Sequence, residues 1–216
     1  MMIILVGAPG CGKGTQSKFI ADKLSYQVVV ASDVLKAAIT SGGSLSDVIN
    51  QYISAGKLLS SNIVNEIMLH HLKSFEGNIS DIILDGYPRT VEQAQFLNSA
   101  YPHLKKLIIY FDISYNDILP RIVGRYSCKS CGALYNKYFA PTTLQEICDS
   151  CGSINFIVRP DDNEQTFQTR WNLFLSDTMP VLNYYKNQNV DLLSVDATLS
   201  QAEVRDSIFS ALSNYF

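Results

Sequence analysis

The sequence of 216 residues contains little charge and no excess of positive charge. Asp, Glu, Lys and Arg make up 17% of the residues, and the formal net charge is −3. Binding to bulk nucleic acid or to an anionic membrane surface is driven by a positive field, which this composition does not supply. We therefore expect a protein that binds neither nucleic acid nor membranes.

Long hydrophobic runs are also absent. No apolar run approaches the roughly 20 residues of a membrane-spanning helix. The apolar stretch at residues 2–6 has no basic flank and no small-residue cleavage site, so it does not resemble a signal peptide. There is no internal repeat and no low-complexity stretch. With 47% hydrophobic residues to form a core, the chain is expected to be a globular, cytoplasmic protein of one domain with insertions.

A glycine-rich loop near the N-terminus carries the first chemical signal. It covers residues 7–16, with the sequence GAPGCGKGTQ, and it directly follows the apolar run 2–6. Apolar residues including Phe19 and Ile20 then recur at helical spacing. Strand, glycine loop and helix in this order indicate a phosphate-binding loop, because backbone N–H groups and the positive helix end converge on one concavity. Lys13 is then placed to reach the outer phosphates of a nucleoside triphosphate.

The hydroxyl of this loop is displaced by one position from the general pattern, in which Ser or Thr directly follows the lysine and ligates magnesium. Here Gly14 follows Lys13, and the hydroxyl belongs to Thr15. This order argues against a general NTPase and resembles the Gly-x-Pro-Gly-x-Gly-Lys-Gly-Thr loop of nucleoside monophosphate kinases. A glycine-rich turn that binds nothing is the alternative.

Strands and helices alternate along the rest of the chain. Further strands are predicted at residues 27–30, 81–85, 107–112 and 190–195, the first of them buried, with helical segments between them, one from about 45 to 55. This alternation predicts an α/β fold with a five-stranded parallel sheet and helices on both faces.

Polar residues end three of these strands. Gly7, Asp85 and Asp112 fall at the carboxyl ends, where ligands bind in such folds. Near the C-terminus, Asp162 with Gln165 three residues later is typical of a capping box and predicts a long helix that runs toward residue 185.

Four of the five cysteines form a spaced pair of knuckles. Cys128, Cys131, Cys148 and Cys151 give C-x2-C-x16-C-x2-C, a spacing typical of ribbon-type zinc sites. Two disulfides or four reduced thiols are the alternatives, and disulfides do not persist in a reducing cytoplasm. Four thiolates would leave no open position on the ion, so a structural Zn²⁺ is predicted. None of the three histidines has ligand spacing with these cysteines.

Together these motifs resemble the adenylate kinases, of the long-lid, zinc-containing bacterial type, over essentially the whole chain. The family's reaction is MgATP + AMP ⇌ MgADP + ADP. The resemblance implies a P-loop NTPase-like core at 1–30, 62–124 and 163–216, a helical NMP-binding insert at 31–61 and a zinc-stapled lid at 125–162. It also implies a monomer that binds ATP, AMP and ADP with Mg²⁺.

The resemblance assigns roles on the acceptor side and at the magnesium ion. Asp85 matches the aspartate that holds the waters of the ion. Arg89, in Asp-Gly-Tyr-Pro-Arg, matches the arginine that grips the AMP phosphate, and Gln93 matches the glutamine that reads the adenine edge. The AMP site implied in full comprises Ala31, Lys36, Gly86, Arg89, Gln93, Arg159 and Arg170.

On the donor side, Arg121 and Arg125 match an arginine stacked on the ATP adenine and one that contacts the ATP phosphates. Arg159 and Arg170 match the pair that clamps the transferring phosphoryl group. Arginine suits these positions because its planar guanidinium binds phosphate through two parallel hydrogen bonds. The ATP site implied in full is Gly10, Cys11, Gly12, Lys13, Gly14, Thr15, Arg121 and Arg125, and the catalytic set is Lys13, Asp85, Arg89, Arg125, Arg159 and Arg170.

Some of these residues have plainer interpretations. Arg121 alone would be a solvated surface charge, and Asp85 could cap a helix. Cys11 lies near a helix N-terminus, where a thiol can be reactive, but we assign it no catalytic role.

The sequence departs from the family pattern at the acceptor side. Where the family usually has Thr/Ser-Gly-Asp-x-Leu-Arg, this chain has Ala31-Ser32-Asp33-Val34-Leu35-Lys36. Lys36 keeps the charge of an arginine that contacts the AMP phosphate but loses its bidentate geometry. Ala31 lacks a hydroxyl normally close to the adenine. We therefore expect weakened AMP binding.

Three alternative functions remain at this point. A related kinase could use GTP as donor, or UMP or CMP as acceptor. The cysteine segment could be a nucleic-acid-binding ribbon on an ATP-driven switch, but residues 126–158 carry only Lys129 and Lys137 against Glu146 and Asp149. A non-catalytic nucleotide sensor is the third, and the complete set of lysine, aspartate and arginines argues against it.

Overall fold

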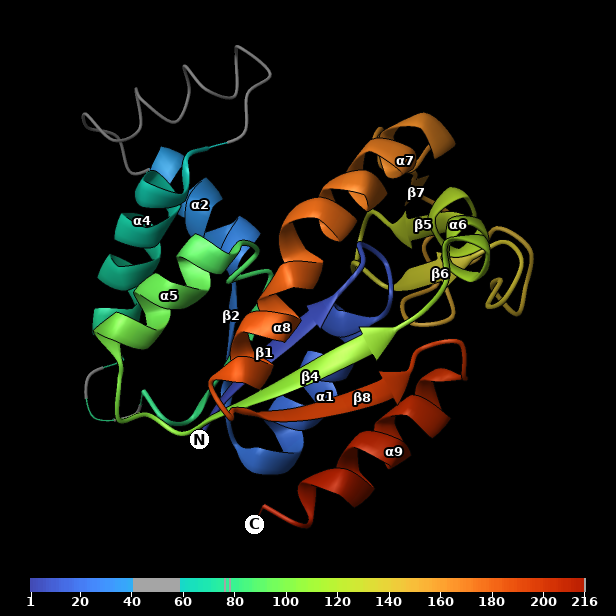
Figure 1. Ribbon diagram of the computed structural model, residues 1–216. Helices are drawn as coiled ribbons and strands as arrows, with labels where there is room; N and C mark the ends of the chain where they lie inside the picture. Colours follow the sequence, from blue (N-terminus) through green and yellow to red (C-terminus); the bar gives the residue numbers. More distant parts are fainter. Residues whose placement is uncertain (41–58, 76, 78, 216) are drawn as a thin grey trace.

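The computed structural model describes residues 1–40, 59–75, 77 and 79–215 (Figure 1). The helix predicted at about 45–55 lies outside these residues. The main sheet has five parallel strands in the order β2-β3-β1-β4-β8, which confirms the predicted sheet. Its strands are β1 Met2–Gly7, β2 Gln27–Val30, β3 Ile82–Asp85, β4 Lys106–Asp112 and β8 Asp191–Asp196.

The helices of the described residues follow the strands in alternation. They are α1 Lys13–Leu24, α2 Ala31–Thr40, α4 Ser61–Lys73, α5 Val91–Ala100, α6 Tyr115–Val123, α7 Glu164–Leu173, the π-helical η1 Phe174–Thr178, α8 Met179–Asn187 and α9 Gln201–Leu212. The consecutive helices α7, η1 and α8 form the long helical segment predicted toward residue 185. None of the helices described is both long enough and apolar enough to cross a membrane.

Both faces of the sheet are covered because strand side chains alternate in direction. In β1, Ile3 and Leu5 belong to one apolar cluster, which α1 and α9 complete. Met2, Ile4 and Val6 belong to a second cluster on the opposite face, completed by α4, α5 and α8. Figure 1 shows this layering, with α1 and α9 on one side of the strands and α8 on the other.

The strand β2 is less buried than its sequence predicts. Only Val29 of its four residues is buried. The run of β-branched residues suits a strand with neighbours on both sides, but β2 is an edge strand that pairs only with β3. The expectation of a buried second strand is therefore wrong, because sheet order is set by tertiary packing.

The start of α7 also differs from the prediction. Asn163, not Asp162, is the N-cap, and its side-chain oxygen accepts from the backbone N–H of Thr166 at 2.9 Å. Asp162 is buried and forms an ion pair with Arg125 instead. Neighbouring Asp and Asn residues both suit an N-cap, so the sequence could not distinguish the cap from its neighbour.

A second, small sheet lies between α6 and α7. It contains β5 Arg125–Cys128, β6 Leu134–Asn136 and β7 Phe156–Ile157 in the antiparallel order β6-β5-β7. Its buried cluster consists only of Cys128, Tyr135 and Cys148. In Figure 1, the arrowheads of β1 and β4 point toward this sheet, which therefore lies at the carboxyl-end side of the main sheet.

Candidate active site

The glycine loop connects β1 to α1 at the carboxyl edge of the main sheet. Gly10 and Gly12 have φ angles of 88° and 102°, in the left-handed region that favours glycine. A Cβ on Gly10 would also lie 2.2 Å from Cδ1 of Ile122, so α6 packs directly on the loop. No side chain caps α1, because its N-cap is Gly12. The N-terminus of α1 therefore keeps its partial positive charge for an anion.

Lys13 lies over the glycine loop. Its Nζ donates to the carbonyl oxygens of Gly7 at 2.7 Å and Ala8 at 2.9 Å, and it lies 3.6 Å from the sulfur of the buried Cys11. These carbonyl partners are neutral, whereas a phosphate carries negative charge and would attract the ammonium more strongly. The geometry thus holds a lysine ammonium beside the loop, able to exchange carbonyls for phosphate oxygens.

Asp85 ends β3 next to this loop. Its Oδ2 lies 3.7 Å from the position that a Cβ on Gly14 would take. Burial raises the pKa of this carboxyl, and the positive charges of Lys13 and Arg89 partly oppose that shift. The interpretation of Asp85 as a helix cap is wrong, because the next helix, α5, is capped by Thr90.

Arg89 lies on a tightly built turn that follows β3, after a cis peptide between Tyr87 and Pro88. Its Nε donates to the carbonyl of Gly86 at 2.9 Å, and its backbone N–H donates to Oε1 of Gln93 at 2.7 Å. Gln93 is buried, so its amide supports the turn. Sequence reasoning assigned Gln93 only to adenine and missed this contact, which no spacing rule predicts.

Arg170 lies within electrostatic reach of three arginines from other segments of the chain: Arg89, Arg125 and Arg159. Burial lowers the pKa of Arg170, on α7, and the nearby positive charges of Arg125 and Arg159 act in the same direction, against Asp161 and Asp162. Arg89 is exposed to solvent. Desolvation by the surrounding protein atoms and the positive charge of Arg170 nevertheless lower its pKa. Like charges held together in this way repel one another, and a bound polyanion would relieve the repulsion.

Arg125 already has an anionic partner within the protein. Its guanidinium forms a fork with both carboxylate oxygens of Asp162, and Nε lies 2.7 Å from Oδ2. The side chain of Asp162 is 1% exposed and that of Arg125 is 22% exposed. This pair links the first residue of β5 to the segment before α7, and it orients the guanidinium at the base of the small sheet.

Arg121 lies in the last turn of α6. Its Nη1 donates to the carbonyl of Ala197 at 2.6 Å, and its Nη2 donates to the carbonyl of Thr198 at 2.8 Å. Arg121 is therefore not a solvated surface charge. Its contacts lie with the segment that follows β8.

The two residues that depart from the family pattern on the acceptor side, Ala31 and Lys36, lie at the start and in the middle of α2. Ala31 is buried, and its Cβ lies 3.8 Å from the position that a Cβ on Gly86 would take, so it adjoins the turn that carries Arg89. Lys36 is exposed, and its Nζ lies 3.6 Å from Oδ1 of Asp33. The structure thus brings Ala31 to the site and leaves Lys36 on the exposed side of α2.

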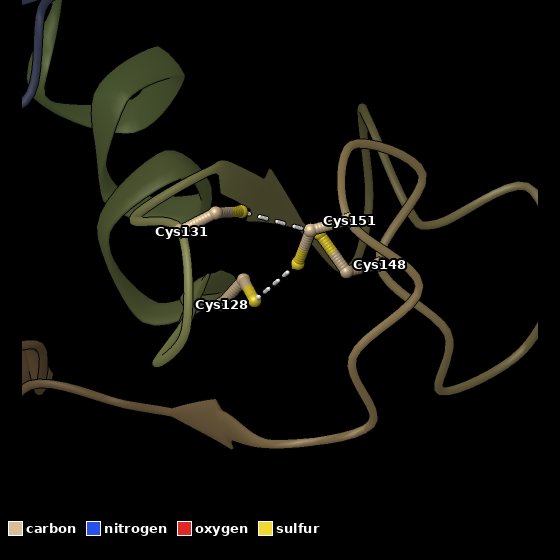
Figure 2. A group of neighbouring side chains, drawn as sticks. All are labelled: Cys128, Cys131, Cys148 and Cys151. Carbon is tan, nitrogen blue, oxygen red and sulfur yellow. Dashed lines mark hydrogen bonds between the residues drawn. The ribbon is translucent and has the colours of Figure 1, made fainter.

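The four spaced cysteines meet in the small sheet (Figure 2). Their sulfur atoms all lie within 4.8 Å of one another, with 3.6 Å between Cys128 and Cys151 and 3.5 Å between Cys131 and Cys148. All four are free thiols, so the two-disulfide alternative is wrong. Tetrahedral zinc–sulfur bonds of about 2.3 Å would place the sulfurs about 3.8 Å apart, so the cluster fits a metal ion.

Backbone and side-chain donors surround these sulfurs. Each knuckle directs backbone N–H groups at its own sulfurs: those of Ser130 and Cys131 at Cys128, and that of Ser153 at Cys151. Such donors stabilise thiolates, the form in which cysteine binds metal. The hydroxyl of Tyr135 lies 3.2 Å from the sulfur of Cys148. Sequence reasoning missed Tyr135, because its position among many aromatic residues gave no signal.

Comparison with known proteins gives a consistent result. The family model described as adenylate kinase matches residues 5–190. The chain is 43% identical over 187 residues to an adenylate kinase of Rickettsia rickettsii (strain Sheila Smith), covering 87% of each chain. It is 41% identical over 212 residues to an adenylate kinase of Rickettsia bellii (strain RML369-C), covering 98% of this chain and 99% of the relative. Because these matches extend over most of the chain, the protein belongs to the adenylate kinase family and is a phosphotransferase of the nucleoside monophosphate kinase type.

Proposed function

We propose that the protein transfers the γ-phosphoryl group of MgATP reversibly to AMP and produces two molecules of ADP. One observation carries this proposal: the positive charges of Lys13 and Arg89 act on the carboxylate of Asp85 at the glycine loop, and Arg170 adjoins Arg89 as well as Arg125 and Arg159. Arg170 is repelled by these arginines when no ligand is bound. A site built in this way suits a pair of polyphosphates whose charges must be neutralised while they react.

The reaction needs positioning and charge neutralisation from this chain. Residues 10–15 cradle the ATP phosphates with backbone N–H groups, and Lys13 exchanges its two carbonyl partners for phosphate oxygens. Arg125, Arg159 and Arg170 stabilise the transferring phosphoryl group, and Arg89 holds the phosphate of AMP. No general base is required, because the attacking oxygen of AMP is already ionised.

A magnesium ion bound with ATP would help to neutralise the negative charge of the phosphate groups during transfer. Asp85 is the residue we expect to hold the waters of this ion. The fit is chemical: a carboxylate is a hard oxygen donor, and Asp85 lies beside the glycine loop and Lys13. Mg²⁺ characteristically needs only one or two protein carboxylates in addition to substrate phosphates.

Residues 125–162 are proposed to act as a lid stapled by Zn²⁺. Cys128, Cys131, Cys148 and Cys151 supply four thiolates, a donor set that suits zinc and leaves no position for substrate. The ion would hold the lid as one body, so that it closes over ATP and excludes water. Residues 31–61 would form the NMP-binding insert, and 1–30, 62–124 and 163–216 the core.

We propose adenine as the base of the acceptor, because Gln93, which matches the family's adenine-reading glutamine, contacts the turn that carries Arg89. Within the described residues, the exposed Lys36 pairs with Asp33, so its reach to the AMP phosphate requires a different side-chain position. We expect Lys36→Arg to strengthen AMP binding about threefold to tenfold, because arginine adds a bidentate contact. Titration calorimetry with AMP measures this, and an unchanged affinity would show that position 36 takes no part in AMP binding.

The substrate pair is tested by chromatographic detection of products with Mg²⁺ and every pairing of ATP or GTP with AMP, GMP, UMP or CMP. Rapid formation of ADP from ATP and AMP alone supports the proposal. Preference for another pairing keeps phosphoryl transfer and changes the substrates, and no transfer to any monophosphate would favour a nucleotide sensor. Size-exclusion chromatography of the same preparation tests the proposed monomer. We also propose a cytoplasmic location, because five free thiols suit a reducing compartment.

A further inference from the structure

The turn between β8 and α9 is fixed at both of its ends. Asp196, the last residue of β8, accepts through Oδ1 from the backbone N–H of Thr198 at 2.9 Å and from its hydroxyl at 2.6 Å. The backbone N–H of Ala197 donates to the carbonyl of Asp112 at 2.8 Å. At the other end, Ser200 and Glu203 form a capping box on α9. Side chains therefore determine where the carbonyl groups of this turn point.

Two of these carbonyl groups hold the guanidinium of Arg121. Nη1 of Arg121 donates to Ala197 and Nη2 donates to Thr198, although the residues lie 76 and 77 positions apart in the chain. A guanidinium is planar, so engaging both terminal nitrogens fixes the orientation of its plane. An arginine without these partners would have to lose its rotamer freedom each time a ligand bound.

We propose that Asp196 and Thr198 are positioning residues for the base of the phosphoryl donor. Their hydrogen bonds fix the conformation of the turn and so the direction of the carbonyl groups of Ala197 and Thr198. These carbonyls orient the guanidinium of Arg121, which then presents a planar cation on which the base stacks. This inference rests on the proposed function and on the family resemblance, which matches Arg121 to the arginine stacked on the ATP adenine. Neither Asp196 nor Thr198 needs to touch the nucleotide.

The chemistry of a stacking platform defines what the positioning affects. A guanidinium plane interacts with the π face of a base and not with its hydrogen-bonding edge. Disturbing the platform should weaken ATP and GTP by similar factors. It should leave a donor without a base, such as ribose 5-triphosphate, unaffected, because the proposed contacts of the phosphates are with the glycine loop and with Arg125, Arg159 and Arg170, not with Arg121.

The first experiment measures the affinity of the full chain for ATP and for ribose 5-triphosphate by titration calorimetry. We compare Asp196→Ala, Thr198→Ala and the control Asp206→Ala, whose exposed carboxylate on α9 pairs with its neighbour Arg205. Asp196→Ala should weaken ATP about tenfold and Thr198→Ala, which keeps its backbone N–H, about threefold. The control should bind both ligands as the parent protein does. Equal weakening of ATP and ribose 5-triphosphate by Asp196→Ala would overturn the proposal, because it indicates a general structural defect.

The second experiment is a double-mutant cycle with Arg121→Ala. If Asp196 acts through Arg121, the double variant binds ATP no more weakly than Arg121→Ala alone. Additive losses would overturn the inference. If Arg121→Ala itself leaves ATP affinity unchanged in an enzyme that is still active, the role of Arg121 in the proposed function is wrong, which is a separate failure. Thr198→Ser, which retains the hydroxyl, should restore parent affinity, and it keeps the test valid if Asp196→Ala does not fold.

Discussion

The main sheet and the small sheet of this protein are stabilised in opposite ways. All six residues of β1 are buried, and clusters of apolar side chains cover both faces of the main sheet. In segment 125–158, which contains the small sheet, the buried apolar side chains are Cys128, Tyr135 and Cys148, and large apolar side chains such as Leu134 at 56% and Ile154 at 71% are exposed. A module of this size cannot form an adequate apolar core, so we expect its order to depend on a metal cross-link at the four sulfurs.

Metal removal should produce the largest difference in stability between the two sheets. Structural zinc contributes an apparent binding free energy of about 10–16 kcal/mol to small domains. Chelation should therefore raise hydrogen exchange throughout residues 125–162 while leaving β1 and β4 protected, and ATP turnover should fall. Metal analysis provides the control: Cys131→Ser should lose the ion, and Cys11→Ala, outside the cluster, should retain it. Equal loss of protection in both sheets would show that the lid and the core unfold together.

A matched pair of truncations compares the two apolar environments directly. Phe111, on β4, is fully buried, whereas Leu134, on β6, is largely exposed. Phe111→Ala should lower the free energy of unfolding by about 3–5 kcal/mol, because it removes buried area and leaves a cavity. Leu134→Ala should change it by less than about 0.5 kcal/mol. Urea unfolding followed by circular dichroism measures both, and similar losses would mean that Leu134 has an apolar partner in solution.

The ion pair at the junction of the two regions should have an intermediate effect. Asp162→Ala leaves the partly buried Arg125 without its carboxylate partner, and we expect a loss of about 1–3 kcal/mol of stability. Thermal unfolding measures the loss, with Asp206→Ala, which removes an exposed carboxylate on α9, as the control. An Asp162→Ala variant as stable as the parent would show that the arginine group does not depend on this anchor.

The smallest effect should be the acid sensitivity of the turn after β8. Hydrogen bonds from Thr198 hold the pKa of Asp196 below its ordinary value of 3.8, and Arg121 adds to the shift. A carboxylate with a lowered folded-state pKa contributes stability above its unfolded-state pKa and loses it as the pH falls through the folded value. Asp196→Asn should therefore reduce the dependence of Tm on pH below about pH 4. Identical Tm profiles for the parent protein and this variant would contradict the assignment.

Local chemistry predicted the elements and motifs that depend on short stretches of sequence. Glycines with a lysine at set spacing indicated the loop between β1 and α1, and strand-length apolar runs indicated the parallel sheet. The C-x2-C knuckles predicted that four sulfurs would meet, which they do within 4.8 Å. These signals act over a few residues, where backbone geometry and side-chain type suffice to define the structure.

Long-range contacts could not be predicted in this way. Asp162 suited an N-cap as well as Asn163 does, and only the position of Arg125 on β5 drew it into a buried ion pair. Val28 and Val30 suited a buried strand, but sheet order placed β2 at the edge. Gln93 supports Arg89, and Tyr135 supports Cys148, through contacts that follow from packing alone.

The sequence by itself thus determined the family, the alternation of strands and helices, the phosphate loop and the cluster of four cysteines. Only the tertiary structure decided which cations lie together and what holds each of them: Asp162 for Arg125, and the turn after β8 for Arg121. The physical reason is one of distance. Propensities and spacings act within a few residues, whereas the field at a guanidinium depends on every charge and carbonyl that the fold brings within several ångströms of it.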